Sequence, residues 1–261
     1  MSKRNLTSRA GQKGFTLIEM SIVLVIIGLI IGGILKGQEV IESSRQKNLI
    51  TQIDATRAAL TTFGDRYRAI PGDWNCAEVN GAICVGRLSA TDAAHLNNGN
   101  GNGIVGATVA AGVANIAGAV AASIAANAEN VQFCVHMAAD NLIGGTTLTA
   151  AAATGFGEGQ PLPSTSLPNA GMSVVHGNYN DLATAARLTH WLRVHRTVAG
   201  GGAALTGKQM FEIDLKIDDT LPASGQFRSG IEAATCGTAA NAAYTASSEV
   251  LACTALIDLI Q

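Results

Sequence analysis

The hydrophobic residues of this chain form one long run near its beginning and then a periodic stripe. No charged residue occurs from Met20 to Leu35, and Glu19 is the one charged side chain between Lys13 and Lys36. As a helix, the stretch from Phe15 to Leu35 is about 31 Å long, which matches the roughly 30 Å core of a bilayer. The run therefore predicts a helix that can span a membrane.

Beyond Lys36 the pattern changes to that of an amphipathic helix. Mostly apolar residues recur at spacings of three and four, which places them on one helical face: Leu49, Ile53, Thr56, Leu60, Phe63, Tyr67 and Ile70. Pro71 disfavours helix at the residue before it, so the helix should run from Phe15 to about Ala69, about 80 Å. A coiled-coil seam would give the same stripe. We favour a helix whose inner half spans the membrane and whose outer half packs on a globular domain.

Two shorter helices are expected later in the chain, after the turn chemistry of Pro71-Gly72-Asp73. The first covers Glu129 to Gly144, where apolar side chains follow a helical spacing and glycine closes the segment. The second begins at a capping-box pattern formed by Thr206 and Gln209 and should stop near Asp218.

Strand patterns occur at Met172–Val175 and at Leu188–Val198, where apolar and polar residues partly alternate. Together with the helices they predict an α+β fold class. Its long N-terminal helix would pack by its outer half on a globular head with a small antiparallel sheet.

Three intervening stretches are expected to be irregular or loosely packed. Residues 97–103 are glycine and asparagine, and their spacing resembles a calcium-binding loop. The run contains no carboxylate and position twelve would be Val109, so a plain turn is favoured. Residues 104–128 carry no charge and are rich in alanine. A helix or insertion packed on the head is favoured there over a second membrane span. Residues 145–170 predict a long surface loop.

Charge and motifs limit the chemistry of the chain. The net charge of -2 implies no polyanion partner, although the first fourteen residues carry four basic side chains and no acidic one. No nucleophile elbow, zinc-protease motif or phosphate-binding glycine loop occurs, so we expect no enzyme, no cofactor and no metal site. The segment His190–Arg196 is interpreted as a half-exposed strand. A nucleic-acid or host-ligand patch formed with Arg187 is the alternative.

Glu19 is the feature that the membrane interpretation must explain. A charged side chain within a bilayer costs about 2.5–3.5 kcal/mol on insertion scales. A cleaved secretory signal would explain the basic start, but its apolar run would be shorter and no clean cleavage site follows it. A simple membrane anchor would explain the length of the run but neither Glu19 nor Gly14.

The sequence Gly14-Phe15-Thr16-Leu17-Ile18-Glu19 resembles the processing and methylation motif of the type IV pilin superfamily, which includes pilins, minor pilins and type II secretion pseudopilins. The resemblance implies that a prepilin peptidase cuts after Gly14 and N-methylates Phe15, and that Glu19 is the assembly glutamate of the mature chain. The domains would then be a leader at 1–14, a transmembrane and filament-core helix at 15–35, its amphipathic continuation at 36–70 and a periplasmic or extracellular head at 71–261. Lys36 lies near the place of a proline found in major pilins, and this favours a minor pilin or pseudopilin slightly.

The same resemblance implies a structural role. The chain would be a single-pass inner-membrane protein before assembly and a subunit of a cell-surface or periplasmic filament afterwards. Its partners would be the prepilin peptidase and other pilin subunits, bound through the N-terminal helix. The alternatives are a type II secretion pseudopilin, or a minor pilin whose head is an adhesin or DNA-binding module.

Five cysteines are present, and in an exported protein they are candidates for disulfides. Cys76 and Cys84 are close in sequence, as are Cys236 and Cys253. The second pair resembles the disulfide-bounded C-terminal region of pilins. We expect both pairs to form and Cys134 to remain a buried thiol, although five cysteines permit other pairings.

Overall fold

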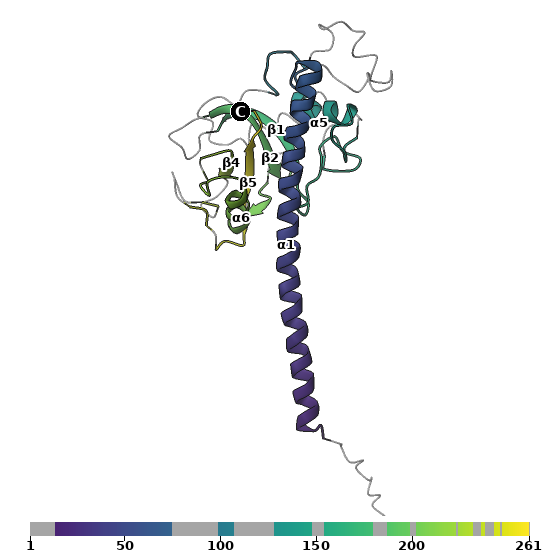
Figure 1. Ribbon diagram of the computed structural model, residues 1–261, viewed down its shortest axis with the longest axis vertical. Helices are drawn as coiled ribbons and strands as arrows, with labels where there is room; N and C mark the ends of the chain where they lie inside the picture. The colour runs from purple at the N-terminus through teal and green to yellow at the C-terminus, as the bar shows by residue number, and fades with distance from the viewer. Residues whose placement is uncertain are drawn as a thin grey trace, which may run out of the picture. The chain divides into compact units, whose positions relative to one another are not determined.

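The computed structural model describes residues 14–74, 99–106, 128–147, 154–179, 187–198, 202–222, 224–231, 236–237, 243–245 and 247–260 (Figure 1). Its internal contacts divide the chain into two units, Met1–Ser44 and Arg45–Gln261. The predicted boundaries after residues 14, 35 and 70 stay predictions. Cys76, Cys84 and nearly all of the alanine-rich segment lie outside the described residues.

Helix α1 spans Leu17–Tyr67 and confirms the long N-terminal helix. Glu19 lies in its first turn and Arg66 in its last, where each charge opposes the partial charge of the helix terminus. The helix ends slightly before the predicted Ala69. Arg68 takes a left-handed conformation (φ 51°), and its amide donates to the Gly64 carbonyl at 2.8 Å.

The stripe on the second part of α1 is also confirmed. Seven residues between Gln46 and Phe63 are buried, and they follow the predicted spacing of three and four: Gln46, Leu49, Ile53, Thr56, Ala59, Leu60 and Phe63. Four of them, Leu49, Ile53, Ala59 and Leu60, join the main apolar core with residues from the later helices and the sheet. The outer part of α1 is therefore a structural element of the head.

The head contains an antiparallel sheet of five strands: β1 (Gly171–Tyr179), β2 (Arg187–His195), β3 (Leu205–Thr206), β4 (Phe227–Ile231) and β5 (Leu251–Asp258). β1 pairs with β2, and β2, β3 and β4 all pair with β5. Ile257 of β5 pairs with Leu192 of β2 and with Phe227 of β4, so these neighbours lie on opposite edges of β5. β5 is thus the strand that holds the sheet together. This confirms the α+β class and both predicted strands.

Helix α5 (Glu129–Ala139) contacts β1, and it ends earlier than the predicted Gly144. Asn141 is left-handed (φ 56°), and its amide donates to the Ala138 carbonyl at 3.0 Å. The Leu142 amide donates to the Met137 carbonyl at 2.9 Å. These two bonds form a Schellman motif, which asparagine can close in place of glycine.

Helix α6 (Gly207–Ile217) contacts β3, β4 and β5. It begins with the predicted capping box, in which Thr206 and Gln209 each accept a hydrogen bond from the other's backbone amide. It also ends where predicted, with Asp218 as its C-cap.

One expectation holds in part and one is wrong. The described part of 145–170 contains no helix or strand, as expected of a loop, but Leu162 and Leu167 are 1% and 4% exposed, so the loop also covers the core. The residues from His190 to His195 are all buried, so β2 is not a half-exposed strand. A strand between two neighbours, covered on both faces, does not need to alternate cleanly.

Candidate processing and assembly segment

The first turn of α1 is closed by a second capping box, formed by Thr16 and Glu19. The Thr16 amide and hydroxyl both donate to Glu19 Oε2 at 2.8 Å, and the Glu19 amide donates to Thr16 Oγ1 at 3.3 Å. The residues Thr-x-x-Glu match the spacing that this motif requires. The chain itself therefore supplies the hydrogen bonds of the Glu19 carboxylate. Sequence reasoning used this pattern at Thr206 but overlooked it at Thr16.

Gly14 and Phe15 lie just before this turn and are exposed. The space around the Gly14 Cα holds no other atom within 4 Å of where a side chain would begin, and the Phe15 side chain is 80% exposed. No described residue covers the predicted cleavage position between them. These positions remain predicted processing residues.

All described residues from Gly14 to Ile41 are exposed, and most of those on α1 are large and apolar. By length and composition, this part of α1 is long and apolar enough to cross a membrane. A water-exposed apolar surface of this extent is a binding surface for lipid or for other protein.

Lys36 continues the helix at the position where the resemblance would place a proline. Its Nζ lies 2.5 Å from Glu39 Oε2, and both side chains are mostly exposed. An exposed pair of this kind adds little stability. The relevant consequence is that the backbone hydrogen bonds of α1 are not interrupted here.

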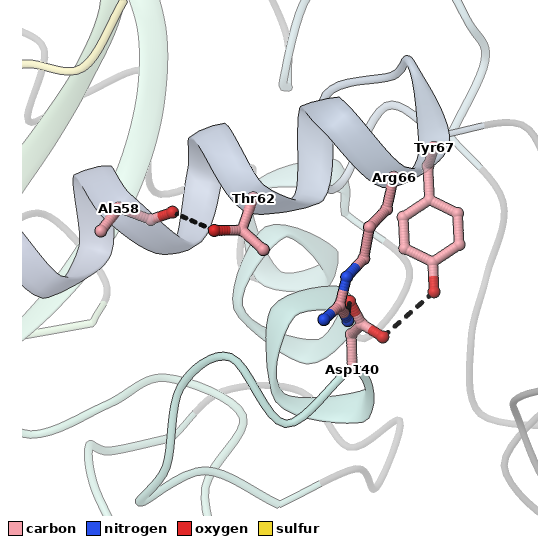
Figure 2. Close-up of polar contacts among 5 residues, drawn as sticks. All are labelled: Ala58, Thr62, Arg66, Tyr67 and Asp140. Carbon is pink, nitrogen blue, oxygen red and sulfur yellow. Dashed lines mark hydrogen bonds and ion pairs between the residues drawn. The ribbon is translucent and has the colours of Figure 1, made fainter.

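The end of α1 is fixed to the end of α5 by polar contacts with Asp140 (Figure 2). Arg66 Nη1 lies 2.6 Å from Asp140 Oδ2, and the Tyr67 hydroxyl donates to Asp140 Oδ1 at 3.1 Å. The Thr62 hydroxyl is instead used within α1, where it donates to the Ala58 carbonyl at 2.8 Å. The Phe63 ring lies against the rings of Tyr67, Trp74 and His136.

The described part of the glycine-asparagine loop is an arrangement of amide donors around two carboxylates from elsewhere in the chain. The Asn102 and Gly103 amides donate to Asp73 at 3.1 and 2.6 Å. The Asn100 and Gly106 amides donate to Glu129 at 3.0 and 2.8 Å. These hydrogen bonds hold the described part of the loop against Asp73 and Glu129, and the choice between a plain turn and a calcium loop stays a prediction.

The basic patch that was the alternative interpretation of His190–Arg196 does not form at the centre of β2. Arg193 is 1% exposed and His195 is fully buried, with His195 Nε2 2.6 Å from the Ser173 hydroxyl. Burial, together with the nearby Arg193 charge, lowers the pKa of His195 to about 3. Burial and the adjacent His176 lower the pKa of His190 to about 4. These side chains belong to the interior of the head, and Arg193 is not available to contact nucleic acid.

The cysteines of the described residues are divided between one disulfide and one thiol. Cys236 and Cys253 form a disulfide that links the segment after β4 to β5. Cys134 on α5 is a buried thiol, and burial raises its pKa to about 12. A thiol held in its neutral form is a poor nucleophile and metal ligand, so Cys134 acts as a core side chain.

Comparison with known families identifies one segment of the chain. The family described as the prokaryotic N-terminal methylation motif matches residues 9–35. No curated protein and no solved structure matches the chain. Residues 9–35 are thus the type IV pilin-type prepilin signal, and its family is structural, not enzymatic. The signal supports a type IV pilin-like or pseudopilin protein that is processed by a prepilin peptidase and assembles with other pilins.

Proposed function

We propose that this chain is a structural subunit of a type IV pilus or a related filament. The observation that carries the proposal is the prepilin signal located at the start of an exposed, apolar helix. In this scheme the protein is first held in the inner membrane by the exposed part of α1. Cutting after Gly14 removes the basic leader, and the same part of α1 then packs against other subunits in the filament.

Glu19 would restrict the move from membrane to filament to subunits whose leader has been removed. Cutting creates a positively charged amine at Phe15, which is then N-methylated. An isolated carboxylate in an apolar environment is very unfavourable, whereas one that is paired and hydrogen-bonded is tolerated. Thr16 already donates two hydrogen bonds to Glu19, and the Phe15 amine of a neighbouring subunit would supply the opposite charge. The pair would therefore form only between subunits that have been processed.

The test is filament yield from cells that express Glu19→Ala, measured by shearing and immunoblotting. The leader should still be removed, as shown by mass spectrometry of the N-terminus, while filament yield falls by an order of magnitude or more. Glu39→Ala is the matched control, because Glu39 is another exposed carboxylate on α1 but lies outside the charge-free run. Normal filament yield from Glu19→Ala would contradict the proposed role of Glu19.

Two alternatives to a major filament subunit can be separated from it by experiment: a pseudopilin and a minor pilin. A pseudopilin would give label confined to the cell envelope when a tag on the head is imaged by immunogold microscopy. A minor pilin with an adhesive or DNA-binding head would give label at filament tips, and a major subunit would give label along whole fibres. The burial of Arg193 weighs against a DNA-binding surface on β2.

A further inference from the structure

Three carboxylates converge where α6 ends and the chain turns toward β4. Asp214, Asp218 and Asp219 each present an oxygen, and these oxygens all lie within 4.8 Å of one another. The C-terminal end of a helix carries partial negative charge and exposes carbonyl oxygens. The described residues contribute no ion pair to any of the three carboxylates. The site therefore concentrates negative charge without a cationic side chain to balance it.

The negative charge without a balancing cation extends into the protein interior at Asp214. Its side chain is fully buried and points into the cluster, and neither of its carboxylate oxygens makes a hydrogen bond. The Tyr244 hydroxyl and the Thr220 amide lie nearby, but neither forms a hydrogen bond of normal geometry with Asp214. A buried carboxylate of this kind requires either a proton or a cation.

The other two carboxylates are held in position by the turn. Asp218 Oδ2 accepts hydrogen bonds from the Gln226 and Phe227 amides at the start of β4. Asp219 accepts from the Leu221 amide at 2.9 Å and from the Ser224 hydroxyl at 2.5 Å. Gly225 is left-handed (φ 71°), and a Cβ there would overlap the Asp218 carboxylate. The positions of these oxygens are thus fixed before any ligand arrives.

We propose that Asp214, Asp218 and Asp219 form a binding site for a hard divalent cation, with Ca²⁺ as the best fit. Calcium takes six to eight oxygen ligands at 2.3–2.6 Å, so oxygens on opposite sides of the ion lie about 4.6–5.2 Å apart. A set of carboxylate oxygens within 4.8 Å matches this span without rearrangement. Softer metals prefer nitrogen and sulfur ligands, which the cluster does not offer. Backbone carbonyls at the end of α6 and water would complete the coordination.

Such an ion would stabilise the head by joining the end of α6 to the start of β4. The full chain, purified in detergent and treated with EDTA, should show a thermal midpoint that rises by several degrees and saturates as CaCl2 is added. MgCl2 should produce a smaller shift, because Mg²⁺ demands shorter bonds and stricter geometry. Absence of any calcium-dependent shift at pH 8, where carboxylates are ionised, would overturn the proposal.

Two variants make the assignment specific. Asp219→Asn changes an exposed residue, so the protein should fold, and its calcium-dependent shift should fall to less than a third of that of the original chain. Asp54→Asn, an exposed carboxylate on α1, is the control and should keep the full shift. An equal shift in all three proteins would place calcium elsewhere. Asp214→Asn should abolish the shift while leaving the metal-free midpoint unchanged or higher, because it removes a buried charge without changing side-chain volume.

Discussion

The first and second parts of α1 use the same backbone geometry but meet opposite surroundings. Every residue of α1 from Leu17 to Ile41 is exposed, although this part is the more apolar. Between Gln46 and Phe63, in contrast, one face is buried in the core of the head and the opposite face is solvated. The less hydrophobic part is thus the one that stabilises the folded chain, and the more hydrophobic part is left for lipid or other subunits.

The difference shows that the arrangement of apolar residues is more informative than their number. A stripe with a spacing of three and four matches one partner surface and can be satisfied within the chain. A helix that is apolar on all sides has no preferred face and needs surroundings that are apolar on all sides. Substitutions that are identical in chemistry should therefore have different consequences in the two parts.

The largest effect on the head is expected from Ile53→Ala. Ile53 is 1% exposed, and removal of such a side chain from a packed core costs about 2–5 kcal/mol. The same change at Ile26, which is 52% exposed, should leave the unfolding free energy of the head unchanged. Urea unfolding of the full chain in detergent, followed by tryptophan fluorescence, measures both. Comparable destabilisation by the two variants would show that the division of α1 is wrong.

Loss of the disulfide should have an effect of similar or slightly smaller size. Cys236 and Cys253 are separated by 17 positions, and closing a loop of this length stabilises by about 3 kcal/mol in the chain-entropy account. Cys253→Ser should lower the unfolding free energy of the head by about that amount without preventing leader removal. Cys134→Ser is the control for thiol chemistry, because Cys134 forms no disulfide. If Cys253→Ser were as stable as the original chain with its disulfide intact, the disulfide would not stabilise the head and the prediction would be wrong.

Acid should destabilise the head through its buried histidines. The folded-state pKa values of His190 and His195 are about 4 and about 3, whereas an unfolded histidine titrates near 6.5. The unfolded chain therefore binds protons first, and stability is lost as the pH falls from about 6.5 toward 4 and below. The pKa of Asp214 is raised to about 7, so the folded head binds this proton before the unfolded chain does. Its contribution to stability therefore grows as the pH falls, opposite to that of the histidines.

A variant separates these contributions. His190→Gln keeps an acceptor for the Val105 amide but cannot titrate. Between pH 7 and pH 4 it should lose less stability than the original chain, by up to about 3 kcal/mol. Urea midpoints at the two pH values provide the measurement. An unchanged pH dependence would mean that His190 is already solvated in the folded head.

The smallest effect is expected from the two capping boxes, one in each unit. Thr206→Ala should cost about 1 kcal/mol of head stability, because an N-cap side chain is lost from α6. Thr16→Ala should leave head stability unchanged and should instead lower filament yield, because it removes the hydroxyl that donates to the Glu19 carboxylate and accepts from the Glu19 amide. A loss of head stability in Thr16→Ala would show that the start of α1 is coupled to the head.

The sequence predicted best those features that depend on short-range patterns. The stripe of α1, the capping box of α6 and the prepilin signal each follow from residues a few positions apart. The end of α5 was misplaced because asparagine at position 141 and glycine at 144 are both plausible terminators, and only backbone geometry selects between them. The burial of Arg193 and His195 depends on which elements cover β2, and the donors that surround Asp73 come from about thirty positions away.

The sequence likewise predicts some residues of the candidate processing segment and misses another. Gly14, Phe15 and Glu19 follow from the motif, and their roles stay predictions. Thr16 was missed although Thr-x-x-Glu is readable in the sequence. The sequence predicts no metal site at the three aspartates. Asp214 becomes a candidate ligand only because it is buried beside the other two, and their spacing in the sequence does not reveal this.

The pairing of the strands has a consequence for the order in which the head can form. β5 follows the other four strands in the chain, yet β2, β3 and β4 are all hydrogen-bonded to it. The hairpin of β1 and β2 can form as soon as its two strands are synthesised, but β3 and β4 have no strand partner until Leu251–Asp258 has been made. The sheet can therefore be completed only after β5 is available. A chain truncated before β5 would leave the sheet unfinished and its strand edges open to proteases.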